Sequence, residues 1–243
     1  MPANLRVVTY NIHKGIGGTD RAYRIERIQK VLDDLQPDIA LLQEVDEGVP
    51  RSHRDRQVDL LAEALGMPYQ AYQKNVRLKQ GHYGNAILSK YPLRAVESID
   101  LTVRPKKRRR ALLARCRVDV GSHDRSLLVY SLHLGLAGLE RKIQLKRLLA
   151  THQIGRASGN IPIVVGGDFN DVYGNLGRSV MFPQGFSSAG KAIHTFPAVL
   201  PVRSLDRIFF RGPFELNHAF AKRTKLAKQA SDHLPLVADF KLS

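Results

Sequence analysis

Residues 163–170 read Ile-Val-Val-Gly-Gly-Asp-Phe-Asn, and this stretch decides how the rest of the chain is interpreted. A short apolar run that ends in glycines is typical of a buried strand. This one runs into a carboxylate, Asp168, and an amide, Asn170. Strand ends are where a rigid sheet can hold polar side chains at one rim. A lone Gly-Gly-Asp is most often a loop, so the other strand ends decide whether the rim carries a site.

Other apolar runs begin or end in the same kinds of side chain. An isolated Asn or Asp beside a strand is usually a turn or cap residue, so each signal alone is weak. Six such strand ends in one chain favour a functional site over that interpretation. Besides Asp168 and Asn170, the polar residues concerned are Asn11, Glu44, His133, Asp206, Asp232 and His233.

Short apolar strands alternate with a few amphipathic helices along the chain. Helical spacing of apolar residues predicts helices at 20–36, 55–66 and 139–154, with Pro37 and Gly66 ending the first two. Two sheets packed face to face with helices outside would satisfy this pattern, as would other mixed α/β folds. No repeat, linker or composition break is visible, so 1–243 is expected to form one domain. Strands are expected at 5–10, 38–42, 83–89, 93–101, 111–120, 126–132, 161–165, 205–210, 214–221 and 236–242.

The chain is strongly basic. It has 38 Lys and Arg against 22 Asp and Glu, a formal net charge of +16 in 243 residues. This favours polyanionic partners such as nucleic acid or an anionic membrane surface, although solubility alone would also explain it. Basic clusters at 104–110 and 222–228 are either solvated loops or guides for an anionic substrate. The chain has no Trp, and no array of aromatic residues accompanies the clusters, so stacking platforms for single strands are not indicated.

Cys116 is the only cysteine, so no intrachain disulfide can form, and it is expected to pack in the core. No apolar signal-peptide region precedes the strand at 5–10. The apolar runs are shorter than the ~18 residues that a transmembrane helix needs. These features predict a cytoplasmic protein, peripheral to the inner membrane surface if its substrate is a lipid.

Taken in chain order, the strand-end motifs resemble those of the endonuclease/exonuclease/phosphatase superfamily. The resemblance spans 5–242, and the ordered pair Gly-Asp-Phe-Asn and Ser-Asp-His is its most specific part. It implies an α/β fold, a four-layer αββα sandwich of two mixed, largely antiparallel sheets with helices outside and the site at one rim. The matching motifs are Tyr10-Asn11, Gln43-Glu44, His133, Gly167-Asp168-Phe169-Asn170, Leu205-Asp206-Arg207-Ile208 and Ser231-Asp232-His233.

The resemblance implies a divalent metal ion. Glu44 would be the principal Mg²⁺ ligand, with Asn11 and Asp232 nearby. All three offer oxygen ligands, which suit Mg²⁺, with Mn²⁺ as a substitute, better than Zn²⁺.

The resemblance also implies acid–base roles. His233, oriented by Asp206, would be the base that activates water, while Asp168 and Asn170 would position the nucleophile and the phosphate oxygens. His133 is similar to the histidine of the pancreatic deoxyribonuclease and sphingomyelinase branches, where it protonates or stabilises the leaving oxygen. The apurinic-endonuclease branch has no matching histidine, so His133 argues against abasic-site repair.

Four further residues are candidates for contacting the substrate. Asn85 falls where family members place a phosphate-contacting or histidine-orienting residue, and Arg110 heads a strand. His13 and Lys14 belong to the segment Asn11-Ile12-His13-Lys14-Gly15. Together with Thr195-Phe196-Pro197, this segment resembles a small bacterial subgroup of metal-dependent hydrolases, which is similar to phospholipid- and glycolipid-processing members. Ordinary loop or strand-edge roles compete for all four.

The sequence therefore predicts Mg²⁺-dependent hydrolysis of a phosphodiester. The subgroup resemblance and the missing aromatic platforms favour a phospholipid or another non-nucleic phosphodiester. An endonuclease or exonuclease on DNA or RNA is the nearest alternative, and a non-catalytic polyanion-binding protein is the alternative from another class. No stable protein partner is implied.

Overall fold

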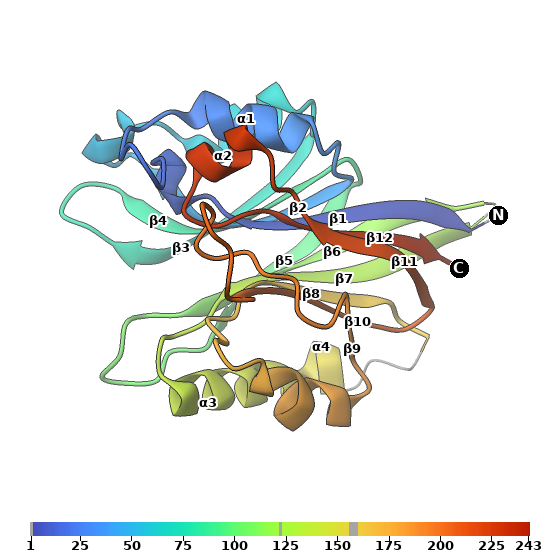
Figure 1. Cartoon of the computed structure of the whole chain (residues 1–243). Helices are drawn as coiled ribbons and strands as arrows, with labels where there is room; N and C mark the ends of the chain where they lie inside the picture. Colours follow the sequence, from blue (N-terminus) through green and yellow to red (C-terminus); the bar gives the residue numbers. More distant parts are fainter. Residues whose placement is uncertain (1, 122, 156–159) are drawn as a thin grey trace.

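Two six-stranded sheets pack face to face in the computed structural model, which describes residues 2–121, 123–155 and 160–243 (Figure 1). The first sheet has the order β11-β12-β1-β2-β4-β3 and the second has the order β5-β6-β7-β8-β10-β9. The strands of the first are β1 (Ala3–Asn11), β2 (Ile39–Glu47), β3 (Tyr69–Arg77), β4 (His82–Ser89), β11 (Phe214–Ala221) and β12 (Leu236–Leu242). Those of the second are β5 (Leu93–Asp100), β6 (Arg110–Val120), β7 (His123–His133), β8 (Ile163–Asp168), β9 (Ser187–Ser188) and β10 (Asp206–Arg211).

The two sheets share one pairing plan. Each has a single parallel pair at its centre, β1 with β2 in the first sheet and β7 with β8 in the second, and its other pairs are antiparallel. Parallel neighbours end at the same edge of a sheet. The carboxyl ends of β1 and β2, and those of β7 and β8, therefore lie side by side.

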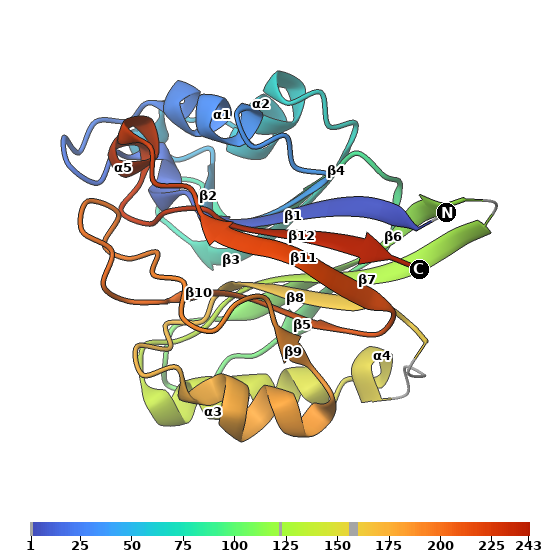
Figure 2. The same cartoon turned by 45° about the vertical axis from the view of Figure 1, so that its right-hand side comes forward.

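Helices cover the outer face of each sheet (Figures 1 and 2). The first sheet carries α1 (Ile25–Asp33), α2 (Gln57–Ala64) and α5 (Lys225–Ala230), and the second carries α3 (Gly138–Leu149), α4 (His152–Gly155) and the π-helical turn η3 (Gly177–Met181). Separate apolar cores fill the three spaces between the four layers. The structure thus confirms the expected αββα sandwich.

No helix among the described residues is long and apolar enough to cross a membrane. Short 3-10 turns complete the chain: η1 (His13–Gly15), η2 (Pro50–Ser52) and η4 (Phe182–Gln184).

The space between the sheets changes character along the strands. On β7 the inward residues are Leu127 and Val129 in the apolar core, then Ser131 and His133. On β1 they are Leu5 and Val7, then Thr9 and Asn11. Because side chains alternate faces with a period of two, each strand carries its apolar residues at one end of this layer and its polar residues at the other. The polar end forms the site.

Several element boundaries differ from the prediction. The helix expected at 20–36 begins only at Ile25, the strand expected at 38–42 continues to Glu47, and the helix expected at 139–154 is divided into α3 and α4. Gly66 follows α2 with φ +58 and ends it, as expected. Among the strands and α-helices, three were not predicted: β3, β9 and α5.

Candidate active site

Four of the five predicted catalytic residues line one cleft of about 430 Å³ at the polar end of the two sheets, and the fifth, Asp206, is buried and contacts the cleft-lining His233. A larger hollow of about 560 Å³ lies beside η3 on the outer side of the second sheet and contains none of them. The cleft is lined by Asn11, Glu44, Tyr83, Lys107, Arg109, His133, Leu136, Asp168, Asn170, Val172, Phe196, Arg203, Leu205, Asp232 and His233.

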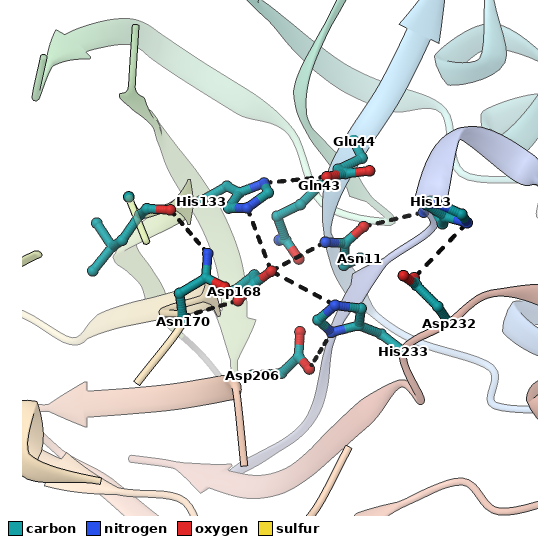
Figure 3. A network of polar contacts seen from close by, with 12 residues as sticks. Asn11, His13, Gln43, Glu44, His133, Asp168, Asn170, Asp206, Asp232 and His233 are labelled. Atoms are coloured by element: carbon teal, nitrogen blue, oxygen red, sulfur yellow. Dashed lines mark hydrogen bonds and ion pairs between the residues drawn. The ribbon is translucent and has the colours of Figure 1, made fainter. Parts of the chain in front are cut away.

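Asp168 is the centre of the polar network (Figure 3). It ends β8, directly opposite His133 on β7 and Asp206 on β10. Its Oδ1 accepts a hydrogen bond from the backbone N–H of Asn170 at 2.9 Å, and its Oδ2 accepts one from Asn11 Nδ2 at 3.1 Å. Burial raises the pKa of Asp168 to about 6, and the neighbouring Asp206 carboxylate acts in the same direction.

Both histidines face the same oxygen of that carboxylate. His133 Nε2 lies 3.4 Å from Asp168 Oδ2, and His233 Nε2 lies 3.8 Å from it. Burial and the Arg109 charge hold the pKa of His133 well below its usual range. Burial would also lower the pKa of His233, but the carboxylates of Asp206 and Asp168 outweigh it and raise that pKa to about 10. His133 is therefore neutral and His233 protonated at neutral pH.

A fixed chain of contacts orients His233. Its Nδ1 lies 2.8 Å from Asp206 Oδ2, and the same oxygen accepts the hydroxyl of Thr195 at 2.5 Å. The ring of Phe196 packs against the imidazole with centroids 4.8 Å apart. Asp206 Oδ1 is buried without a hydrogen-bond partner, so all polar support of this carboxylate passes through Oδ2. Sequence reasoning predicted the pairing of Asp206 with His233 but not these roles of Thr195 and Phe196.

A β-bulge brings Glu44 to the rim. Regular alternation would place Glu44 on the helix side of β2, with Ala40 and Leu42. The register between β2 and β4 shifts after Leu42, and Glu44 takes φ +56. Its carboxylate consequently enters the cleft, where Oε1 is 4.0 Å from His133 Nδ1 and Oε2 accepts from Lys14 Nζ. Positive φ values at such residues are costly and cluster at functional sites.

The donors around Glu44 fit a hard cation. Burial works against ionisation of Glu44, but the neighbouring His133 imidazole and the Lys14 ammonium outweigh it and lower the pKa of Glu44 to about 2, so the carboxylate is ionised. Asn11 and Asp232 line the same cleft. Among the described residues, no group of three or more His, Cys, Asp or Glu side chains gathers as a metal cage. Mg²⁺ is usually held by one or two carboxylates together with several waters and substrate phosphates, rather than by a complete protein cage.

Three cations also line the cleft. Lys107 and Arg109, from the loop between β5 and β6, and Arg203 line the cleft. Arg109 Nε is buried without a hydrogen-bond partner. Sequence reasoning identified the cluster 104–110 but singled out Arg110. Arg110 Nη1 instead donates to Ser98 Oγ at 3.3 Å, so Arg109 rather than Arg110 reaches the cleft.

The other substrate candidates have structural contacts. Asn85 is buried behind the cleft, and its Nδ2 donates to the carbonyl of Arg110 at 3.0 Å, which ties β4 to β6 across the two sheets. The backbone N–H of His13 donates to Asn11 Oδ1 at 3.1 Å, and its Nδ1 lies 3.9 Å from Asp232 Oδ1. His13 thus borders the expected metal ligands, as Lys14 does through Glu44.

Comparison with known proteins agrees with this geometry. Residues 8–233 match the model of the Endonuclease/Exonuclease/phosphatase family. An uncharacterised protein of Escherichia coli K12, YbhP, is 30% identical over 252 residues, which cover 98% of this chain and 97% of YbhP.

Solved structures share the fold at lower identity. An endonuclease/exonuclease/phosphatase from Beutenbergia cavernae superposes with a TM-score of 0.82 at 22% identity, covering 99% of this chain and 72% of that one. ANGEL2, a 2′,3′-cyclic phosphatase solved with adenosine-2′,3′-vanadate, superposes with a TM-score of 0.75 at 19% identity, covering 99% of this chain and 96% of its own. The family match, the sandwich and the ordered motifs agree, and the chain belongs to the endonuclease/exonuclease/phosphatase family.

Proposed function

We propose that this chain is a divalent-metal-dependent phosphodiesterase that hydrolyses its substrate in the cleft between the two sheets. The observation that carries the proposal is the convergence of two imidazoles on one carboxylate, 3.4 and 3.8 Å from Asp168 Oδ2. Hydrolysis of a phosphodiester needs one proton removed from water and one given to the departing oxygen, and two histidines can do both. A non-catalytic polyanion binder would not require this convergence.

We assign the metal site to Glu44, with Asn11 and Asp232 beside it. Mg²⁺ is the proposed ion, and Mn²⁺ is its expected substitute because both prefer oxygen donors. The ion, when bound, would supply a Lewis acid that neutralises charge on the phosphate oxygens. The contact of Lys14 Nζ with Glu44 supports this assignment, because it places a positive charge on the same carboxylate.

The remaining roles belong to the side chains of the chain itself. Arg109 and Lys107 would bind the phosphate oxygens, and Asn170 and Asp168 would position the reacting groups. His233 is proposed as the base and His133 as the group that assists the leaving oxygen. A base has to be neutral, so this assignment requires the pKa of His233 to fall from about 10 when a cation binds near Asp232.

The proposed substrate is a phospholipid or another non-nucleic phosphodiester. The cleft has apolar as well as cationic walls, since Leu136, Val172 and Phe196 line it together with the basic residues. A nuclease remains the rival because Lys107, Arg109 and Arg203 would also bind a nucleic acid backbone. Cleavage of DNA, RNA and lipid by the same preparation decides between them. The proposed location is the cytoplasm, at the inner membrane surface when a lipid is bound.

Metal removal is the first test. Hydrolysis of bis(p-nitrophenyl) phosphate should stop in chelator and return with Mg²⁺ or Mn²⁺. Glu44→Gln should raise the metal concentration for half-maximal rate by roughly tenfold or more, because a neutral amide replaces the ionised ligand. Glu26→Gln is the matched control, since Glu26 is an exposed acid on α1. Full activity in chelator would contradict the proposed mechanism.

A further inference from the structure

The topology brings four loops of the second sheet to the mouth of the cleft. His133 at the end of β7 lies opposite Asp168 at the end of β8, and Asp168 lies opposite Asp206 at the start of β10. The start of β6 is at the same edge, where Ala111 pairs with Leu132. The loops 101–109, 134–137, 169–176 and 189–205 therefore leave the sheet beside the catalytic residues. Both chain termini lie at the opposite end of the molecule (Figures 1 and 2).

Three of these loops, together with the first turn of α3, expose large apolar side chains. The most exposed are Tyr173 at 80%, Leu136 at 77%, Leu139 at 73% and Leu200 at 71% of their full accessible area. Apolar side chains gathered on one face mark a binding surface rather than the usual scatter. The full set on this face is Leu136, Leu139, Val172, Tyr173, Val199, Leu200 and Val202. Within the described ranges, the exposed large apolar side chains elsewhere are Tyr69, Val96 and Phe182.

Hydrogen bonds hold one of these loops in its projecting shape. The backbone N–H of Arg203 donates to the carbonyl of Phe196 at 2.8 Å, and that of Leu200 donates to Pro197 at 3.1 Å. The N–H of Ala198 donates to the carbonyl of Asp232 at 2.7 Å, which fixes the loop to the catalytic segment. Leu200 is therefore presented to solvent by a fixed turn.

The fourth loop supplies positive charge beside the apolar residues. The segment 101–109 contains Arg104, Lys106, Lys107, Arg108 and Arg109 and no acidic residue. In the part of the chain that the structure describes, none of these five forms an ion pair with a carboxylate. An apolar projection next to unpaired cations is the combination that binds an anionic bilayer, where the apolar groups enter the interface and the cations meet the headgroups.

We propose that these four loops form a docking face that seats the cleft on an anionic phospholipid membrane. The exposed apolar side chains and the positive charge of 101–109 together indicate a bilayer as the binding partner of this face. A nucleic acid backbone would match the charge of 101–109 but would leave Leu136, Leu139 and Leu200 in water. The cleft-lining Leu136 and Val172 continue the apolar surface inward, so a headgroup phosphodiester would enter between apolar and cationic walls. This docking role rests on the proposed function, and the bilayer would be the source of the substrate.

Vesicle binding by matched double variants tests the docking face. Tyr173→Ser with Leu200→Ser removes two exposed side chains of the face, neither of which lines the cleft. Tyr69→Ser with Val96→Ser removes a tyrosine and an aliphatic residue from the edge strands β3 and β5. Sedimentation with vesicles of phosphatidylcholine and phosphatidylglycerol should show wild-type binding that weakens with salt. The first variant should bind on the order of tenfold more weakly or worse, and the second should bind as wild type.

Hydrolysis of bis(p-nitrophenyl) phosphate in solution separates docking from catalysis. Both double variants should keep the wild-type rate on this soluble ester. The docking face is wrong if wild type does not bind anionic vesicles at low salt, or if both variants bind equally well. Soluble hydrolysis would then leave the proposed function standing. Vesicle binding lost only in the Tyr173 and Leu200 variant, without hydrolysis of any ester, would support docking and refute the function. Tight binding to duplex DNA without binding to vesicles would assign the face to nucleic acid and overturn the inference.

Discussion

His133 and His233 lie against the same carboxylate, yet their surroundings set their protonation in opposite directions. Arg109 acts with burial on His133 to lower its pKa, whereas Asp206 and Asp168 overcome burial at His233 and raise its pKa. These opposite shifts place the proton on His233 rather than on His133. The proposed roles need a neutral His233 as the base and a protonated His133 as the acid. An experiment that identifies the acid therefore tests them.

The leaving group can identify which histidine is the acid. Nitrophenolate departs without a proton, so His133→Ala should slow bis(p-nitrophenyl) phosphate much less than an alkyl ester such as glycerophosphoethanolamine. His233→Ala should lower kcat on both esters by roughly 10²–10⁴, the usual range for a general base. His218→Ala is the control, since His218 is exposed on β11. A leaving-group dependence in the His233 variant instead would exchange the two roles.

Sequence reasoning succeeded where a residue's position on a strand end was enough. Asn11, His133 and Asp168 end apolar runs, so their meeting at one rim could be predicted. Thr195 and Arg109 could not be found in this way because they lie in loops whose path is set by tertiary contacts. Thr195 reaches Asp206 only because the segment 195–203 folds back on itself and is bonded to 232–234.

At the scale of elements, Gly167 controls how closely β7 and β8 approach beside the catalytic residues. A Cβ at this position would lie 1.9 Å from the carbonyl oxygen of Leu132, which is the neighbour of His133. Gly66 takes φ +58, but a Cβ there would have no atom within 4 Å. Both glycines have a positive φ, +155 at Gly167 and +58 at Gly66, so the contact with Leu132 is what distinguishes Gly167.

Gly167→Ala should destabilise the chain by about 1–3 kcal/mol or more, because the strands must separate to admit the methyl group. It should also reduce activity, since the separation moves Asp168 away from His133. Gly66→Ala, the control, should cost about 1 kcal/mol from its left-handed conformation and leave kcat unchanged. Urea unfolding and the hydrolysis assay measure both effects. Equal stability and activity in the two variants would mean that β7 and β8 can move apart at little cost in free energy.

The elements that the sequence did not reveal lack a hydrophobic pattern of their own. β3 points Ala71, Gln73 and Asn75 inward, and the last two are buried polar residues. Gln73 Nε2 donates to the carbonyl of Ala111 at 2.9 Å, so hydrogen bonds replace the apolar contacts that make a strand visible. α5 has six residues and overlaps the basic cluster 222–228, and within the helix Ala227 and Ala230 alone are buried. Strands with alternating apolar residues, by contrast, were predicted to within a few positions.

At the scale of the whole molecule, the middle layer joins the two sheets into one body. Leu41 of β2 reaches across to β8, where a Cβ on Gly166 would lie 2.5 Å from its Cδ1. Cys116 of β6 is buried in the same layer, and burial raises the pKa of its thiol to about 12. The catalytic residues come from both sheets, so the cleft is formed only while the two sheets remain packed against each other. Nothing short of the complete sandwich is expected to be active.

We therefore expect the chain to unfold as one cooperative unit, as the prediction of a single domain requires. Circular dichroism reports all layers. Tyrosine fluorescence reports the surroundings of the eight tyrosines, of which Tyr10 and Tyr130 are buried in the outer cores, and reaction of the Cys116 thiol reports the layer between the sheets. The three urea transitions should share one midpoint. Leu41→Ala should lower that midpoint for every probe together, by about 2–5 kcal/mol in unfolding free energy. A thiol that reacts at lower urea than the loss of dichroism would show instead that the sheets separate before either unfolds, and Cys116→Ser controls for reagent bound elsewhere.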